Sequence, residues 1–121
     1  MKLNNRFAPY ITLALIVFIV WGRTLWFNYI YLDDNAIILN NLDFLRHIAN
    51  LPKLFFQDIF FSGQNQIYYR PLFTLSLMFN AVLAGDNPFW YHLTNIGLHI
   101  IVVWLVYGLM LKLGYRKSVA I

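Results

Sequence analysis

The carboxylate side chains that could carry chemistry in this sequence are five aspartates, because the chain contains no glutamate. Two of them, Asp33 and Asp34, are adjacent, and neighbouring carboxylates repel each other unless a cation or a hydrogen-bond donor compensates. The pair could bind a divalent metal such as Mg²⁺ or Mn²⁺, or one aspartate could act as a general base toward a hydroxyl group. The alternative is structural: one of them caps a short helix that begins near Asn35.

Arg70 is the second candidate, because it directly precedes Pro71, a residue that favours the first position of a helix. A cation there faces the positive end of the helix dipole, which is unfavourable without an anion. A bound phosphate would accept hydrogen bonds from Arg70 and from the free amides of the helix. A salt bridge to a loop aspartate and an interfacial position at the membrane remain as alternatives.

His92, Asn95 and His99 form one stripe of a helix, because seven residues are nearly two helical turns. The two imidazoles are then roughly 10 Å apart along the helix axis, too far to share one metal ion. Polar groups inside a membrane span usually face a protein interior or a wet cavity. The spacing therefore predicts a polar seam that packs against other helices.

Composition excludes several classes of protein. The chain is 60% hydrophobic and 12% charged, about half the charge of a usual soluble domain, which disfavours a soluble enzyme or a nucleic-acid partner. No cysteine is present, so disulfides and thiolate metal sites are excluded. The sequence also lacks a dinucleotide-binding glycine motif, a P-loop, a zinc-protease motif and a nucleophile elbow.

Two long apolar stretches must position these residues, at 7–27 and 89–111. Each approaches the roughly 20 residues that a helix needs to cross a bilayer. A cleaved signal peptide is the alternative for the first stretch, but its end is aromatic and lacks the small residues of a cleavage site. The apolar segment 71–84 is too short to span and fits an interfacial or protein-buried helix.

Basic residues orient the two spans. They flank both ends of the chain, whereas all the aspartates lie between the spans; the flanking residues are Lys2, Arg6, Lys112, Arg116 and Lys117. The positive-inside rule therefore predicts a cytoplasmic N-terminus (1–6), a cytoplasmic basic tail (112–121) and an extracytoplasmic loop (28–88). In the loop we expect short juxtamembrane helices at about 42–50, 53–61 and 71–84. The predicted fold is an all-α integral membrane hairpin.

Three local sequences, in this order along the chain, resemble a known family. They are Leu32-Asp33-Asp34 with Phe27, Ile37 and Asn40 around it, Tyr68-Tyr69-Arg70-Pro71-Leu72, and Asn87-Pro88-Phe89-Trp90-Tyr91-His92-Leu93-Thr94-Asn95 followed by His99. With the flanking spans they resemble the start of GT-C-type polyprenyl-phosphate-sugar glycosyltransferases, in particular the transmembrane, tetratricopeptide-repeat-containing O-mannosyltransferase-like proteins and their bacterial relatives.

The resemblance implies a GT-C fold, of which this chain would be the N-terminal part. It implies that Asp33 and Asp34 line an active site on the extracytoplasmic face, one of them as the base or metal partner for sugar transfer. It also implies a polyprenyl- or dolichyl-phosphate-linked sugar as donor, whose phosphate Arg70 could hold. A multi-pass protein of the bacterial inner membrane or the endoplasmic reticulum is the implied location.

Size separates this chain from that family, whose members have many more spans. Two helices cannot enclose a cavity for a lipid-linked sugar, so we expect one segment of a larger enzyme, inactive alone, that contacts the bilayer and the remaining helices or a partner subunit. One alternative is a small two-span interaction subunit that docks through its polar seam. Another is an ion- or proton-handling protein, which the absence of aspartates within the spans disfavours.

Overall fold

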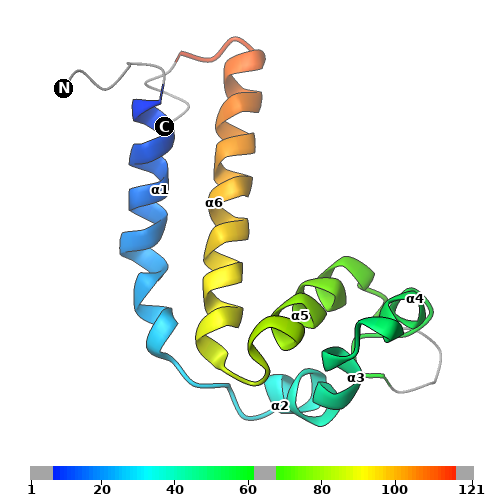
Figure 1. The fold of residues 1–121 in the computed structure, drawn as a ribbon. Helices are drawn as coiled ribbons and strands as arrows, with labels where there is room; N and C mark the ends of the chain where they lie inside the picture. Colours follow the sequence, from blue (N-terminus) through cyan, green and yellow to red (C-terminus); the bar gives the residue numbers. More distant parts are fainter. Residues whose placement is uncertain (1–6, 62–67, 117–121) are drawn as a thin grey trace. The chain divides into compact units, whose positions relative to one another are not determined.

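The computed structural model describes residues 7–61 and 68–116, and within these ranges the chain is helical and contains no strand (Figure 1). It divides into two compact units, one formed by Met1–Trp26 with His92–Ile121 and the other by Phe27–Tyr91. The predicted N-terminal segment 1–6 and the tail residues 117–121 lie outside the described residues, and so do the orienting residues Lys2, Arg6 and Lys117.

The first unit is a pair of long helices. Helix α1 (Ala8–Trp21) continues as a 3-10 helix, η1 (Gly22–Trp26), and α6 (Pro88–Lys112) returns antiparallel to it, so that the start of α1 and the end of α6 lie at the same end of the pair (Figure 1). The 19 residues of Ala8–Trp26 and the 25 of Pro88–Lys112 are long and apolar enough to cross a membrane. They correspond to the stretches predicted at 7–27 and 89–111.

Aromatic side chains join the two helices. Tyr10 makes edge-to-face contacts with Trp104 and Tyr107, at centroid distances of 6.1 and 5.1 Å. The Trp104 indole Nε1 also donates to the Tyr10 carbonyl at 2.9 Å. Most other apolar side chains of the pair face outward; Ile19, for example, is 78% exposed. Such a surface requires lipid or further helices to cover it.

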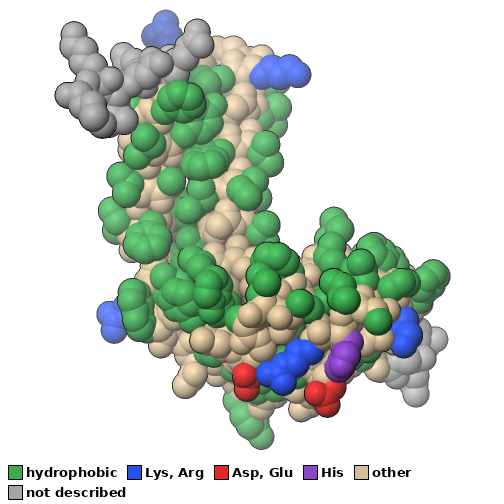
Figure 2. Space-filling view, viewed as in Figure 1, with side chains coloured by type: hydrophobic (Ala, Val, Ile, Leu, Met, Phe, Trp, Pro, Cys, Tyr) green, Lys and Arg blue, Asp and Glu red, His purple; other side chains and the backbone are tan. Residues whose placement is uncertain are grey.

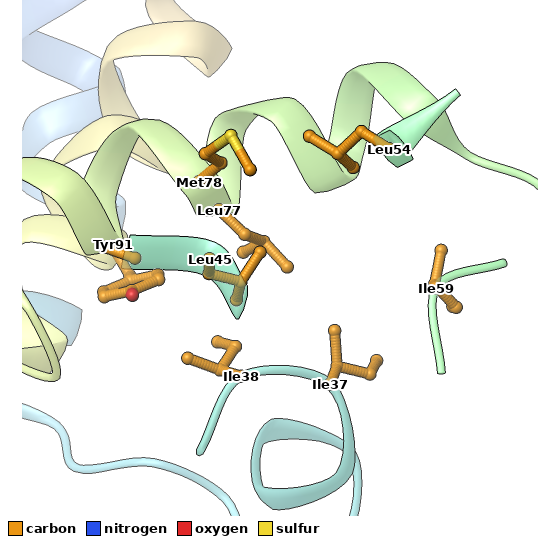
Figure 3. Close-up of a cluster of buried hydrophobic side chains, with 9 residues drawn as sticks. Ile37, Ile38, Leu45, Leu54, Ile59, Leu77, Met78 and Tyr91 are labelled. Atoms are coloured by element: carbon orange, nitrogen blue, oxygen red, sulfur yellow. The ribbon is translucent and has the colours of Figure 1, made fainter. Parts of the chain in front are cut away.

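The second unit consists of short helices around a small core. Its elements are α2 (Asp33–Ile37), η2 (Leu39–Asn41), α3 (Leu42–Arg46), η3 (Ile48–Asn50), α4 (Leu51–Leu54) and α5 (Pro71–Ala84). Buried side chains from these elements and the start of α6 meet in one cluster (Figure 3), which includes Ile37, Ile38, Leu45, Leu54, Ile59, Leu77, Met78 and Tyr91. Leu45 and Leu54 are almost completely buried, so α3 and α4 are fixed by packing.

The predicted helices at 42–50 and 53–61 are wrong in extent. Helix α3 ends at Arg46 because His47 adopts an extended conformation, with ψ of 105°. Pro52, which lies between the two predicted ranges, is in the first turn of α4, where its missing N–H has no intrahelical role. Helix α4 in turn ends at Leu54, and the following chain turns where the Asp58 carboxylate accepts a hydrogen bond from the Phe60 amide at 2.8 Å.

Local sequence signals set the bounds of α5 and the start of α6. Helix α5 has the expected range, with Pro71 in its first turn and Gly85 just after its end at a φ of +67°. Few residues other than glycine adopt that conformation at low cost. Asn87 then accepts a hydrogen bond from the Phe89 amide at 3.1 Å, as an N-terminal cap does.

Charged and apolar side chains gather on different parts of the second unit. In Figure 2 its acidic, basic and histidine side chains lie mainly along one edge, while hydrophobic side chains cover much of the adjoining surface. Helix α5 contributes to that apolar surface because several of its outward-facing side chains are large and exposed: Leu72, Phe73, Phe79, Val82 and Leu83. The unit therefore has an apolar face besides its core.

Candidate functional site

The aspartate pair forms the first turn of α2 and follows an unusual backbone conformation at Leu32. Leu32 has φ of +85° and ψ of −94°, a region that side chains bearing a Cβ rarely occupy. It is the residue before the helix, and no side chain caps that end. The capping alternative for the pair is therefore wrong. Instead, Asp34 Oδ2 accepts a hydrogen bond from the Ile30 amide at 2.7 Å, upstream of the strained residue.

Packing fixes α2 from its other end. Ile37 and Ile38 are buried in the core of the second unit. The Asn41 side chain, at the residue just before α3, donates to the carbonyls of Ala36 at 2.7 Å and Ile37 at 3.3 Å. It thus satisfies the C-terminal carbonyls of α2 and makes no side-chain cap for α3. The strained turn at Leu32 is therefore fixed on one side by the packing of α2 and on the other side by the hydrogen bond from the Ile30 amide to Asp34.

The two carboxylates have different environments. Asp33 is exposed, and its carboxylate makes no hydrogen bond or ion pair with any residue that the structure describes. Asp34 is half-buried and one of its oxygens is bonded to the backbone. An exposed, unpaired carboxylate can accept a proton or bind a cation, whereas Asp34 mainly maintains the turn. Adjacency alone does not distinguish the two residues, so both were predicted as equivalent candidates.

Arg70 lies at the N-terminal end of α5, as predicted from Pro71. Its carbonyl accepts hydrogen bonds from the Thr74 amide at 3.1 Å and from the Thr74 hydroxyl at 3.2 Å. Its guanidinium is exposed and forms no ion pair within residues 7–61 and 68–116, with Asp33 and Asp34 included. Arg70 therefore remains available to an anion.

His92, Asn95 and His99 line one pocket of about 310 Å³ in the first unit. The other lining residues are Trp21, Thr24 and Ile96, and the Trp21 ring meets the His99 ring edge-on at 6.3 Å. The stripe belongs to the helix pair, whereas the aspartates and Arg70 belong to the second unit. The contribution of Trp21 and Thr24 was missed, because helical periodicity relates residues of one helix only.

Similarity to known proteins indicates the family to which this chain is related. The protein O-mannosyl-transferase Tmtc1 of Drosophila melanogaster is 34% identical over 97 residues, which are 78% of this chain. Human protein O-mannosyl-transferase TMTC1 is 35% identical over 86 residues, and human TMTC2 is 37% identical over 78. This chain is homologous over part of its length to the TMTC-family protein O-mannosyltransferases. The resemblance predicted from the three local sequences is thereby confirmed.

The homology covers only a small part of each relative. The matched region is 11% of the Drosophila Tmtc1 protein, 10% of human TMTC1 and 9% of human TMTC2, so the chain spans about a tenth of their length. No family model and no solved structure matches the chain. The homology to the TMTC proteins therefore indicates a mannosyltransferase-related family, and it does not show transferase activity in this chain.

A metal site of the kind predicted at Asp33 and Asp34 would need further ligands. No group of three or more histidine, cysteine, aspartate or glutamate side chains converges in the described part of the chain. Mg²⁺ is often held by one or two carboxylates together with waters and substrate phosphates. Adjacent residues of a helix do not face each other, so the exposed Asp33 fits that pattern as a single protein ligand, provided that the substrate and waters supply the remaining oxygens.

Tyr29 is a neighbour of the site that sequence reasoning missed. Its ring meets that of Tyr91 edge-on at 5.8 Å, and its hydroxyl oxygen is buried without a hydrogen-bond partner among the described residues. Burial raises the pKa of the Tyr29 hydroxyl above its ordinary value, and Tyr91, Asp86 and Asp34 nearby raise it further. Tyr29 and Tyr91 lie at opposite ends of the second unit's sequence, so no local pattern indicates their contact.

Proposed function

We propose that this chain provides the acceptor-activating segment of a membrane glycosyltransferase. The enzyme would transfer a sugar, of the mannosyl type by homology, from a polyprenyl- or dolichyl-phosphate donor to an acceptor hydroxyl on the extracytoplasmic face. The partial homology to TMTC O-mannosyltransferases supports the reaction class. The observation that carries the proposal is the unpaired Asp33 carboxylate, presented on a turn that Asp34 maintains.

Asp33 acts as the general base in this proposal. It takes the proton from the acceptor hydroxyl while the hydroxyl oxygen forms a bond to the anomeric carbon of the sugar. The bond from that carbon to the phosphate oxygen breaks, and the lipid phosphate leaves with the bonding electrons. A positioned base of this kind contributes typically about 10²–10⁴-fold to a rate. Asp34 is a positioning residue, because it acts through the turn.

Arg70 pairs with the phosphate of the donor. Negative charge grows on the phosphate oxygens as the sugar leaves, and a guanidinium can form two hydrogen bonds to them. The exposed, unpaired guanidinium at the start of α5 supports this role. A divalent metal at the aspartate pair, when bound, would neutralise further phosphate charge.

The proposed topology is a two-span hairpin in a multi-pass membrane protein. The antiparallel α1 and α6, with Lys112 and Arg116 following the second span, support cytoplasmic ends and an extracytoplasmic second unit. Because most apolar side chains of the helix pair face outward, two helices do not enclose a donor site. Transfer therefore requires further spans, and these 121 residues alone should be inactive.

The test is sugar transfer in membranes where this chain is part of an active transferase. Asp33→Asn should lower the transfer rate by about 10²-fold or more while the amount of membrane-inserted chain stays unchanged. Arg70→Ala should weaken donor use, and Arg70→Lys should restore part of it. Asp43→Asn is the matched control, since Asp43 is another exposed aspartate of the second unit. Wild-type transfer by Asp33→Asn would remove Asp33 from the mechanism.

A two-span interaction subunit is the second candidate, favoured by the polar pocket and the uncovered apolar faces. In that case photo-crosslinking from α6 should capture one larger membrane partner, and Asp33→Asn should leave glycosylation unaffected. Loss of transfer in Asp33→Asn with normal partner capture would instead favour the catalytic role.

A further inference from the structure

An apolar groove between α1 and α6 lies near the end of the pair where α1 begins and α6 ends (Figure 1). Its volume is about 440 Å³, and it is lined by Tyr10 of α1 and by one stripe of α6. The stripe includes Ile101, Leu105 and Leu109, each of which is at least half exposed, and ends at Lys112. All these residues belong to the two candidate spans, so hydrocarbon would adjoin the groove.

The stripe is about as long as one leaflet of a bilayer is thick. Ile101 and Lys112 are eleven residues apart, which is about 16 Å along a helix. Half of the hydrocarbon core measures about 15 Å. When Ile101 lies near the middle of the bilayer, the Lys112 ammonium therefore lies at the level of the lipid head groups.

Lys112 has no carboxylate partner in its own unit. The first unit contains no aspartate or glutamate, because all five aspartates lie between Phe27 and Tyr91. The Lys112 ammonium also forms no ion pair within residues 7–61 and 68–116. Basic pockets between membrane helices bind anionic lipid head groups, whose phosphates accept charge-assisted hydrogen bonds. The charge at the end of the groove therefore favours a ligand with an anionic head.

The stripe lacks the pattern of a surface that packs against another helix. Close packing of membrane helices commonly uses small residues spaced four apart. Gly108 is small, but the residues four before and four after it are Trp104 and Lys112. A helix seated there would also bury the lysine without a partner unless that helix carried an acid. A flexible acyl chain needs neither small residues nor an acid.

We propose that the apolar groove binds an anionic diacyl phospholipid of the surrounding bilayer. One acyl chain lies along the stripe and passes over Gly108, and the phosphate accepts a hydrogen bond from the Lys112 ammonium. Because Tyr10 forms the other wall of the groove, the bound lipid contacts both helices. The ligand is a constituent of the membrane, and its binding does not depend on Asp33, which belongs to the other unit.

The experiment uses the full chain in phosphatidylcholine nanodiscs, to which phosphatidylglycerol with the same acyl chains is added in steps. The indole NMR signals of isotope-labelled tryptophans are followed, because Trp104 lines the groove whereas Trp26 and Trp90 lie outside it. The Trp104 signal should shift and saturate at a low fraction of phosphatidylglycerol. The Trp26 and Trp90 signals should not follow the same curve.

Two matched glycine variants test the floor of the groove. An added Cβ meets no atom within 4 Å at Gly108 or at Gly97, so both positions accept a side chain without displacing α1. Gly108→Leu should weaken phosphatidylglycerol binding several-fold, because the leucine occupies the path of the acyl chain. Gly97→Leu is the same change on the same helix outside the groove and should bind like the unaltered chain. Unchanged helix content shows that each variant folds.

Lys112→Gln tests the contact with the head group. It should raise the fraction of phosphatidylglycerol needed for half-saturation by about tenfold, the factor that one hydrogen bond to a charged group contributes. Arg116→Gln is the control, because Arg116 is an exposed cation that follows α6 and does not line the groove. It removes the general attraction between a cation and an anionic membrane surface, so its effect should be much smaller.

Three results would overturn the proposal. They are a Trp104 signal that does not respond selectively, equal losses in Lys112→Gln and Arg116→Gln, and unweakened binding in folded Gly108→Leu. Crosslinks from Leu105 to another transmembrane helix, without a response to lipid, would overturn it in favour of helix packing. Because Asp33→Asn should bind phosphatidylglycerol like the unaltered chain, failure of the transfer proposal is distinguishable from failure of this one.

Discussion

At the scale of single residues, the aspartate turn depends on a leucine in an unfavourable conformation. Holding a residue with a Cβ in so sparsely populated a region of φ and ψ costs on the order of 1–3 kcal/mol. Leu32 keeps this conformation because the chain is fixed on both sides of it. Before α2 the Ile30 amide donates a hydrogen bond to Asp34, and within α2 the Ile37 side chain is buried. Strain of this kind persists where the surroundings over-determine the backbone, as they often do at functional sites.

Leu32→Gly should therefore not destabilise the turn, in contrast to most replacements by glycine. Relief of the unfavourable backbone conformation offsets the larger chain entropy of glycine, which is about 0.5–1 kcal/mol, so a net gain of up to about 2 kcal/mol is expected. Hydrogen-exchange protection of the Ala36 and Ile38 amides measures the effect. Leu32→Val, which cannot relieve the strain, is the control and should lower protection. Reduced protection in Leu32→Gly would contradict a strained turn.

Tyr29 predicts a dependence of stability on alkaline pH. Its pKa is raised in the folded chain, so the stability linked to its neutral form is complete below the ordinary tyrosine value of about 10. That stability is lost as pH rises through the folded value. Tyr29→Phe should flatten this loss in unfolding measured by circular dichroism in micelles. It should also leave neutral-pH stability equal or higher, since a buried hydroxyl without a partner is removed.

Tyr31→Phe is the matched control for Tyr29→Phe, because Tyr31 is exposed. It should retain the alkaline loss of stability. Identical pH profiles for the unaltered chain and Tyr29→Phe would show that Tyr29 is not the group responsible.

Residue type and adjacency predicted which side chains could belong to the site, but they did not predict the role of each one. Asp33 and Asp34 are equivalent in the sequence; their difference arises from the φ of Leu32, which brings the Ile30 amide to only one of them. Helical periodicity likewise placed His92, Asn95 and His99 on one stripe. The other wall of their pocket depends on how α1 is rotated against α6, and no local pattern contains that information.

At the scale of elements, prolines and glycines explain which helices were predictable. Helix α5 begins at Pro71 and ends before Gly85, both of which act locally, and its range follows from the sequence. No proline or glycine marks the break after Arg46. The break occurs at the extended His47, and this conformation lets Leu45 and Leu54 both reach the core. Long-range packing therefore decided the bounds of α3 and α4, and sequence spacing could not.

Gly85 offers a test of the turn between α5 and α6. Gly85→Ala should destabilise the second unit by about 1–2 kcal/mol, since its φ of +67° disfavours any Cβ. An added Cβ would also lie 2.6 Å from Nη2 of Arg46, which would have to move away from its partner Asp86. Urea unfolding of the chain in micelles, followed by protection of the second unit's amides, measures the change.

Gly97→Ala is the control for Gly85→Ala. Gly97 lies within α6, and an added Cβ there meets no atom within 4 Å. In a helix interior alanine is favoured over glycine by roughly 0.5–1 kcal/mol, so this variant should be neutral or stabilising. Equal destabilisation by the two substitutions would contradict the special role of the turn.

At the scale of the whole molecule, the absence of cysteine makes the topology directly testable. Single cysteines replace exposed residues in each region: Tyr31 in the second unit, Ile19 within α1 and Leu113 after α6. An impermeant maleimide should modify Tyr31→Cys in intact cells or sealed vesicles of native orientation, and Leu113→Cys only after permeabilisation. Ile19→Cys should stay unmodified in both, because hydrocarbon surrounds it.

The reverse labelling pattern would place the aspartate pair in the cytosol. It would exclude the proposed use of a donor on the extracytoplasmic face, whatever the homology to O-mannosyltransferases. Modification of Ile19→Cys in intact membranes would show that α1 lines water.

The indole–carbonyl bond between Trp104 and Tyr10 has a consequence for both sides of α6. It fixes the rotation of α6 about its long axis relative to α1. The histidine stripe therefore lies on one side of α6, and a separate apolar groove on the opposite side is lined by Ile101, Leu105 and Leu109. A chain without this bond could keep both helices in the bilayer yet spin about their long axes. The imidazoles would then turn toward acyl chains, and insertion would survive while the polar pocket between the helices would not.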